Sequence, residues 1–295
     1  MQRITGRTRL VGLFGWPTEH SVSPAMQNAA LAAMGLDWCY VPLPVPPDRL
    51  PEAIAGLQSL GFVGANVTVP HKQATMACMD RLTKEARVVG AVNTILLGAK
   101  GLTGHNTDVS GFLRALADAE MEANGRVVVL GAGGAARAVV YALCATADEI
   151  LILNRHADRA EALAADMATH GAGRVRGAAL EATTLAQAVA GASLVVNTTS
   201  AGMWPDVDAM AWCPEVTYPG DVSLFDLVYN PQETMLMRLA GRAGARAENG
   251  LGMLLHQGAE SLRLWSGREP DVAIMRRACL EALEGKRHAT LPDRR

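Results

Sequence analysis

"RVVVLGAGGAARAVVYALCA", residues 126–145, places a run of apolar residues directly before a glycine-rich turn and a helix-forming sequence directly after it. Gly131, Gly133 and Ala136 fit the pattern G-x-G-x-x-G/A. The first glycine makes the turn, the second admits a pyrophosphate, and the small third residue lets helix and strand pack closely. The pyrophosphate then lies at the helix N-terminus, which favours an anion. A glycine turn alone is often only a tight turn, but the flanking strand and helix together predict a dinucleotide site.

The next apolar run, EILILNR (149–155), indicates which dinucleotide binds. An NAD site usually ends this strand with Asp or Glu, which holds the ribose hydroxyls. Here Asn154 and Arg155 stand at that point, and Arg159 follows one turn later. No carboxylate repels a 2′-phosphate, and two guanidinium groups can bind one. The arginines could also be solvated surface residues, but with the glycine turn upstream we predict NADP rather than NAD.

Strand and helix patterns alternate along the chain, which predicts an α/β fold. The segments SLVVNTTSAGM (193–203) and SLFDLVYNP (223–231) supply two further strands that end in polar loop residues. Such alternation predicts a parallel, doubly wound sheet of the Rossmann type, with helices on both faces. The N-terminal third also alternates, and ILLGAKGLTG (95–104) predicts a hairpin.

Length and composition describe a globular protein without a strong charge bias. Its 295 residues suit two domains, with 49% hydrophobic and 19% charged residues. The net charge of −2 offers no basic field for nucleic acid or an anionic membrane, and no apolar run approaches the ~18 residues of a membrane span. The five cysteines and seven histidines form neither CxxC nor HExxH. We therefore expect no disulfide framework, no metal site and a cytoplasmic location.

Polar side chains in NVTVPHK (66–72) indicate a binding surface. In a strand, the polar residues Asn66, Thr68 and Lys72 face one way and the two valines, 67 and 69, the other. The valines can enter a core, so the polar set must line water or a ligand.

A second candidate lies in HSVSPAMQN (20–28), where Ser23 suits an N-cap and Pro24 a first helical residue. Ser21 stands two residues earlier, so both hydroxyls can face the same way. A helix N-terminus with two extra hydroxyls can bind a carboxylate. Simple capping by Ser23 is the commoner role of such a residue.

Two ionisable residues stand near predicted helix starts. Lys72 opens a helix predicted over 71–82, and Asp108, within GHNTDVSGF (104–112), opens another. The helix dipole favours an ionised carboxylate at Asp108. If the fold brings the two together, they can hold and move a proton. Taken singly, Lys72 suits a surface lysine and Asp108 a cap.

These segments together resemble the shikimate dehydrogenase family over nearly the whole chain. The matching blocks, in order, are SVSP (21–24), NVTVPHK (66–72), GAVNT (90–94), GHNTD (104–108), GAGGAARA (131–138), NR (154–155), NTTSAGM (197–203), DLVYNP (226–231) and MLLHQGA (253–259). The resemblance implies that Lys72 and Asp108 are the catalytic pair and that Ser21 and Ser23 hold the substrate carboxylate. The implied ring-hydroxyl partners, and a tyrosine lining the same pocket, are Asn66, Thr68, Asn93, Gln257 and Tyr229.

The resemblance also extends the predicted NADP site. The residues implied to lie along the nicotinamide are Thr198, Ser200, Leu227, Gly250 and Met253. The residues predicted from the glycine turn and the next strand are Gly131, Ala132, Gly133, Gly134, Ala135, Asn154, Arg155 and Arg159.

The implied activity is the reversible, NADP-dependent reduction of 3-dehydroshikimate to shikimate, a step of aromatic amino-acid biosynthesis. Residues 1–107 plus 252–286 would form an N-terminal α/β substrate domain, and 108–251 a Rossmann-type NADP-binding domain, with the active cleft between them. Residues 287–295 would be a disordered tail. The implied partner is a small cyclic hydroxy acid, with no nucleic acid or membrane, and the protein would be a monomer or homodimer.

Two departures from the family pattern leave alternatives open. Many members have a histidine at Gln27 and a threonine at His156. A dehydrogenase of quinate or an aminated shikimate analogue, possibly using NAD, would differ in a few pocket contacts. A non-catalytic sensor conflicts with the intact Lys72 and Asp108. A methylene-tetrahydrofolate enzyme would leave the serine pair and GHNTD unexplained.

Overall fold

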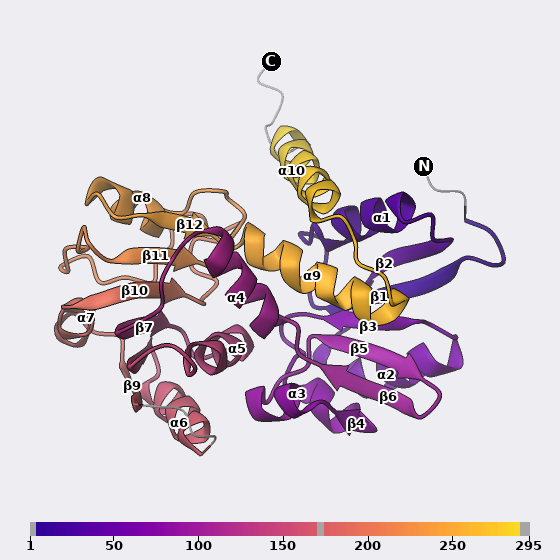
Figure 1. The fold of residues 1–295 in the computed structure, drawn as a ribbon, viewed down its shortest axis with the longest axis horizontal. Coiled ribbons are helices and arrows are strands. Elements are labelled where there is room, and N and C mark those ends of the chain that lie inside the picture. Colours follow the sequence, from indigo (N-terminus) through magenta and orange to yellow (C-terminus); the bar gives the residue numbers. More distant parts are fainter. Residues whose placement is uncertain (1–3, 170–173, 290–295) are drawn as a thin grey trace. The chain divides into compact units, whose positions relative to one another are not determined.

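The structure is a computed structural model that describes residues 4–169 and 174–289. The described chain divides into two compact units (Figure 1). The first contains the residues up to Thr107 and those from Leu255 onward, and the second is the continuous segment Asp108–Leu254. Within the described ranges, no helix is both long and apolar enough to cross a membrane.

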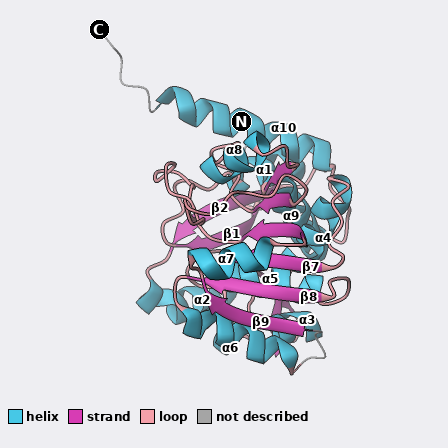
Figure 2. Cartoon of the chain, turned by 90° about the vertical axis from the view of Figure 1, so that its left-hand side faces the viewer, coloured by secondary structure: helices cyan, strands magenta, loops and turns pink. Residues whose placement is uncertain are grey.

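The second unit contains a parallel sheet of six strands in the order β12-β11-β10-β7-β8-β9. Its strands are β7 (Arg126–Leu130), β8 (Glu149–Asn154), β9 (Arg174–Ala179), β10 (Ala192–Asn197), β11 (Ser223–Asp226) and β12 (Ala247–Asn249). Figure 2 shows β7, β8 and β9 side by side. The chain moves outward from β7 in one direction and then from β10 in the other, which confirms the doubly wound fold.

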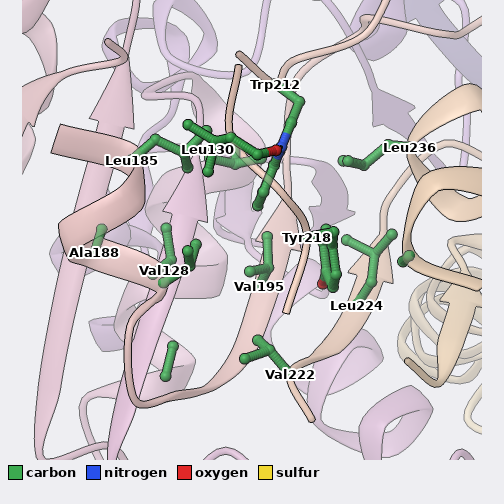
Figure 3. Packing of buried hydrophobic residues seen from close by; sticks show 14 of the residues in the cluster. Val128, Leu130, Leu185, Ala188, Val195, Trp212, Tyr218, Val222, Leu224 and Leu236 are labelled. Carbon is green, nitrogen blue, oxygen red and sulfur yellow. The ribbon is translucent and has the colours of Figure 1, made fainter. Parts of the chain in front are cut away.

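Helices connect these parallel strands, as crossover connections require. They are α4 (Asp108–Asp118), which precedes β7, then α5 (Gly134–Leu143), α6 (Ala157–Ala168), α7 (Ala182–Val189) and α8 (Met235–Arg242). The strands carry branched apolar residues that are buried, such as Val128 and Val195, which is typical of a sheet covered on both faces. Trp212 and Tyr218 pack in the same core with ring centroids 4.9 Å apart (Figure 3).

A buried carboxylate at the end of β11 holds three chain segments together. Asp226 is fully buried and accepts hydrogen bonds from Asn197 Nδ2 (2.8 Å), the Val228 N–H (3.1 Å) and Thr234 Oγ1 (2.7 Å). Thr234 also caps α8, because its side chain accepts from the Met237 N–H. Burial raises the pKa of Asp226 above its usual value, and the hydrogen bonds from these three donors offset only part of that rise.

Replacing Asp226 with alanine is expected to destabilise the protein by about 3 kcal/mol, because buried donors are left unsatisfied. Urea unfolding should therefore show a lower midpoint. Asp221→Ala removes an exposed carboxylate just before the same strand and should leave the midpoint nearly unchanged. Equal midpoints for the two variants would contradict the structural role of Asp226.

The first unit contains a mixed sheet of six strands in the order β2-β1-β3-β5-β6-β4. Its strands are β1 (Arg9–Gly15), β2 (Trp38–Pro44), β3 (Gly64–Val67), β4 (Arg81–Leu82), β5 (Thr94–Gly98) and β6 (Gly101–His105). Strands β2, β1 and β3 are parallel, whereas β5 pairs antiparallel with β3 and β6. The β5–β6 pair confirms the hairpin predicted from the sequence.

The helical segments of the first unit come from both ends of the chain. They are α1 (Ser23–Ala33), η1 (Pro47–Arg49), α2 (Leu50–Ser59), η2 (Ala74–Cys78), α3 (Lys84–Val89), α9 (Leu251–Ser266) and α10 (Val272–Ala289). The residues of α9 up to Leu254 belong to the second unit. Helix α10 includes residues 287–289, which we had expected to be disordered, and residues 290–295 lie outside the described residues.

Three local expectations for the first unit were wrong. Strand β3 ends at Val67, and Val69 is 69% exposed rather than in the core. A turn closed by the His71 N–H and the Thr68 carbonyl follows, so no helix covers 71–82 and only the short η2 forms. Ser23 is the first residue of α1 and not its cap. The Ser21 hydroxyl instead accepts from the Ser23 N–H at 3.2 Å.

Candidate functional site

The carboxyl ends of the parallel strands in the second unit bring together most of the predicted cofactor residues. The strand order reverses between β7 and β10, and ligands of doubly wound sheets bind at such a point. The glycine turn follows β7, Thr198 follows β10, and Asn154 ends β8. Leu227 follows β11. Because all these strands are parallel, these residues share one edge of the sheet.

The glycine turn has the geometry that a dinucleotide requires. Gly131 has a φ of +104°, and a Cβ there would lie 2.7 Å from Thr198 Oγ1. Its N–H donates to the Leu153 carbonyl (2.8 Å), which joins the turn to β8. Helix α5 begins at Gly134, and Ala136 is fully buried. A side chain at Gly131 would therefore be strained and would collide with the next loop.

The end of β8 presents two arginines to solvent. Asn154 ends the strand and donates from Nδ2 to the His156 carbonyl (2.9 Å), which shapes the turn into α6. Arg155 and Arg159 are exposed on either side of the start of α6. Neither has an ion-pair partner among the residues that the structure describes. Both guanidinium groups are thus available to an external phosphate. The strand itself ends in the neutral Asn154, and the nearest carboxylate in the sequence is that of Asp158, in the first turn of α6.

The segments after β10, β11 and β12 carry the residues predicted for the nicotinamide. Thr198 donates from Oγ1 to the Leu130 carbonyl (2.7 Å), and Ser200, two residues later, is exposed. The Leu227 N–H donates to the Asn197 carbonyl (2.9 Å). Gly250 packs directly on Leu227, because a Cβ at Gly250 would lie 2.0 Å from the Leu227 carbonyl oxygen. Met253, in the first turn of α9, is buried, and Tyr229 lies two residues beyond Leu227 in the same unit.

In the first unit, backbone and side-chain contacts fix the turn that carries Lys72. The Lys72 carbonyl accepts from the Val92 N–H (2.8 Å), so the turn lies beside the segment that leads to Asn93. His71 is buried, and its Nε2 lies 2.7 Å from the Val45 carbonyl oxygen. The Thr75 hydroxyl donates to the His71 carbonyl (3.0 Å). Lys72 itself is half-buried.

Asn93 joins three of the predicted segments. It is buried, and its Oδ1 accepts from the Thr107 N–H (2.8 Å), while its Nδ2 donates to Thr107 Oγ1 (2.9 Å) and to Gln257 Oε1 (3.3 Å). Asp108 follows Thr107 directly, is 3% exposed and is the first residue of α4, as predicted. Lys72 belongs to the first unit and Asp108 to the second, so their pairing stays a prediction.

Asn66 takes part in a hydrogen-bond network that the sequence did not predict. Its Oδ1 accepts from the Tyr40 hydroxyl (2.8 Å), and its Nδ2 donates to the Asn93 carbonyl (3.1 Å), to Thr94 Oγ1 (3.1 Å) and to Ser261 Oγ (3.0 Å). The sequence signal for Ser261 was its position four residues after Gln257 on the same helix, which places both on one face.

The start of α1 carries the serine pair and contacts α9. Ser23 is buried and Ser21 half-buried, and the Ser21 N–H donates to the Thr18 carbonyl. Gln27 Nε2 donates to the Gly258 carbonyl (2.9 Å), and its buried Oε1 has no hydrogen-bond partner within the described chain. Gln27 therefore links α1 to α9 at the residue next to Gln257. Thr68 is half-buried just beyond β3, and its N–H donates to the Phe14 carbonyl.

Comparison with known proteins decides the family. Residues 13–95 match the model described as "Shikimate dehydrogenase substrate binding domain", 115–204 match "Shikimate / quinate 5-dehydrogenase", and 250–280 match "Shikimate 5'-dehydrogenase C-terminal domain". A relative named shikimate dehydrogenase (NADP(+)), from Geobacter metallireducens, is 46% identical over 289 residues, which cover 95% of this chain and 99% of that protein. The chain belongs to the shikimate dehydrogenase family.

Solved structures of this family share the fold. Shikimate 5-dehydrogenase from Thermus thermophilus, in complex with NADP(H) and shikimate, is 36% identical with a TM-score of 0.83, covering 93% of this chain and 100% of that chain. Quinate dehydrogenase from Corynebacterium glutamicum, in complex with NAD, is 33% identical with a TM-score of 0.83, covering 93% of this chain and 99% of that chain. The predicted membership of the shikimate dehydrogenase family is thus confirmed, and family members differ in substrate and cofactor.

Proposed function

We propose that this protein is a shikimate dehydrogenase that catalyses the reversible, NADP-dependent reduction of 3-dehydroshikimate to shikimate. The 46% identity to a relative of that name, over nearly the whole chain, supports the activity. The observation that carries the cofactor assignment is the end of β8, where Asn154 stands in place of an acidic residue and Arg155 and Arg159 are exposed. An acidic residue there would hold the ribose of NAD and repel the 2′-phosphate of NADP.

The proposed cofactor residues form the carboxyl edge of the parallel sheet. The glycine turn and the N-terminus of α5 would hold the pyrophosphate, and the two arginines the 2′-phosphate. The residues proposed for the nicotinamide are Thr198, Ser200, Leu227, Gly250 and Met253. When bound, NADPH supplies the hydride for the ketone carbon.

The proposed substrate residues bind the acid and complete the proton transfer. Ser21 and Ser23, at the N-terminus of α1, would hold the carboxylate. Ring hydroxyls would contact the polar side chains Thr68, Asn93 and Gln257, and Tyr229 would line the same pocket. Lys72 would give a proton from Nζ to the ketone oxygen as the carbon receives the hydride, with Asp108 as its partner in the acid–base pair. The carbonyl then becomes an alcohol, and the lysine regains a proton from solvent.

Initial rates measured in the oxidative direction at pH ~8–9 would test this proposal. The assay pairs shikimate and quinate separately with NADP and NAD, since few pocket contacts separate the two acids. We expect fast reduction of NADP with shikimate, and slow or no reduction with the other three pairs. Preferred oxidation of quinate, or equal use of NAD, would replace the proposal with the quinate dehydrogenase alternative. Steady turnover of either acid would exclude a non-catalytic sensor.

We further propose that the protein acts in the cytoplasm, as a monomer or a homodimer. The net charge of −2 and the absence of a spanning helix among the described residues are compatible with this assignment. Sedimentation analysis would determine the oligomeric state, and cell fractionation the location.

A further inference from the structure

A single buried hydroxyl connects four segments of the first unit. Ser261, in the middle of α9, is fully buried and lies 2.9 Å from the Gln257 carbonyl oxygen. Its Oγ lies 2.8 Å from Thr94 Oγ1 and 3.1 Å from Thr107 Oγ1, and it accepts from Asn66 Nδ2 at 3.0 Å. Ser261 thus joins α9 to β3, to β5 and to the segment after β6.

The amide of Asn66 has no hydrogen left for a ligand. The Asn93 carbonyl can only accept, which fixes Nδ2 on that side of the amide and Oδ1 toward the Tyr40 hydroxyl. Burial raises the pKa of Tyr40, so the phenol keeps the proton that it donates. Nδ2 has three partners within the unit for its two hydrogens. Asn66 is 6% exposed, and all its partners are groups with no proposed contact to substrate other than the Asn93 main chain. Asn93 differs, because one of its Nδ2 bonds is the long contact (3.3 Å) to the side chain of Gln257, which is itself proposed to bind a ring hydroxyl.

We propose that Ser261 is a positioning residue for the substrate site, and that Asn66 belongs to the same framework rather than to the groups that touch the substrate. This inference rests on the proposed function. Ser261 contacts Thr94, which donates to Asn93 Oδ1 (3.0 Å), and Thr107, which also donates to Asn93. On the other side it holds the main chain of Gln257. The network therefore fixes the two side chains proposed to bind ring hydroxyls, Asn93 and Gln257, before substrate arrives.

Fixing these groups in advance has a physical advantage. Hydrogen-bonding side chains discriminate between polyols only when their positions are set by neighbours, since a mobile amide would adapt to the wrong hydroxyl pattern. The side chains that form these hydrogen bonds are hydroxyls and amides, which hold their geometry without carrying a charge.

Ser261→Ala tests the proposal, and Ser266→Ala is a matched control. Ser266 lies on the same helix and makes the same kind of bond, from Oγ to the Leu262 carbonyl four residues earlier (2.7 Å), but its other contacts are to Arg268. We expect Ser261→Ala to lower kcat/KM for shikimate about tenfold, with KM for NADP within about twofold of wild type. Ser266→Ala should leave both constants near wild type. Similar values for the two variants would overturn the proposal.

Two further variants separate hydrogen bonding from packing. Ser261→Cys fills the same space with a poor hydrogen-bonding group, so it should behave like Ser261→Ala. Wild-type kinetics for the cysteine variant would mean that volume matters rather than the hydroxyl, which overturns the proposal. Tyr40→Phe removes the other anchor of Asn66, and should lower kcat/KM for shikimate severalfold. Its effect should not simply add to that of Ser261→Ala, because both act on one network.

Amide hydrogen exchange distinguishes this inference from the proposed function. Without any ligand, Ser261→Ala should speed exchange in residues 92–97 and 255–261 relative to Ser266→Ala. Unchanged exchange would overturn the positioning role even if the wild type oxidises shikimate. Faster exchange in Ser261→Ala, together with a wild type that is inactive with shikimate, would support the framework and reject the proposed function alone.

Discussion

Replacing Lys72 with alanine is expected to lower kcat for shikimate oxidation by about 10²–10⁴-fold, the usual contribution of a positioned general acid or base. Its turn is fixed by the Val92 N–H and by His71, which is anchored on Val45, so loss of the ammonium should leave the surrounding backbone in place. KM for shikimate should change much less than kcat, because the proton transfer develops only in the transition state.

Lys84→Ala is the control for this substitution. Lys84 is an exposed lysine of the same unit, at the start of α3, and its replacement should leave both constants near wild type. Initial-rate kinetics of both variants, with thermal unfolding as a check on folding, would decide the matter. A Lys72→Ala enzyme with normal kcat and a raised KM would make Lys72 a substrate-binding residue and not the acid.

Replacing both Arg155 and Arg159 with alanine is expected to raise KM for NADP by about 10²-fold. Hydrogen bonds to charged groups are worth about 1.5–3 kcal/mol each, and solvent exposure brings each arginine to the lower end of that range. KM for NAD should stay near its wild-type value, since NAD has no 2′-phosphate. The effect should also diminish as salt is raised, because both guanidinium groups are exposed.

The control is a second double variant, in which Arg174 and Arg242 are both replaced with alanine. It removes the same number of positive charges from another part of the second unit. Arg174 begins β9 and Arg242 ends α8, which leads toward the start of β12, so both lie toward the amino edge of the parallel sheet. Parallel kinetics with NADP and NAD would compare the two double variants. Equal increases in KM for NADP would show a general charge effect and contradict a specific 2′-phosphate site.

The elements that the sequence predicted well are those with strong local signals. Strand β7, the turn at Gly131 and helix α5 follow from an apolar run, a glycine pattern and a helical pattern in direct succession. Strand β8 ends at Asn154, as expected from the point where the apolar run stops. The doubly wound fold then follows from repetition of the same unit.

The turn after β3 was not predicted, because its cause is not local. His71 makes its side-chain hydrogen bond to Val45, which is 26 residues away, and Lys72 receives one from Val92. The pattern of polar and apolar residues over 71–82 does not reveal either contact. Alternation alone therefore extended the strand too far and placed Val69 in the core, whereas its side chain is exposed.

For the candidate site, the sequence indicated which polar residues matter, but it did not indicate which groups they form hydrogen bonds with. Asn66 was expected to face a ligand, yet its hydrogen bonds go to residues of β2, β5 and α9. Tyr40 and Ser261 are ordinary members of an apolar strand and helix by sequence, and only the fold reveals that their hydroxyls meet the same amide. Hydrogen-bond partners distant in sequence become visible only in three dimensions.

The first unit is built from two separate segments of the chain, and this determines the order in which the two units can fold during synthesis on the ribosome. Residues up to Thr107 emerge first, but the framework around them needs Ser261, and the Ile95 carbonyl needs the Trp265 indole N–H (2.9 Å). The continuous segment Asp108–Leu254 has its own sheet and core, and it is synthesised in full before the part of α9 that belongs to the first unit. The first unit therefore cannot finish folding until α9 has been synthesised. The second unit, although it is synthesised after the N-terminal strands, is the first that can finish folding.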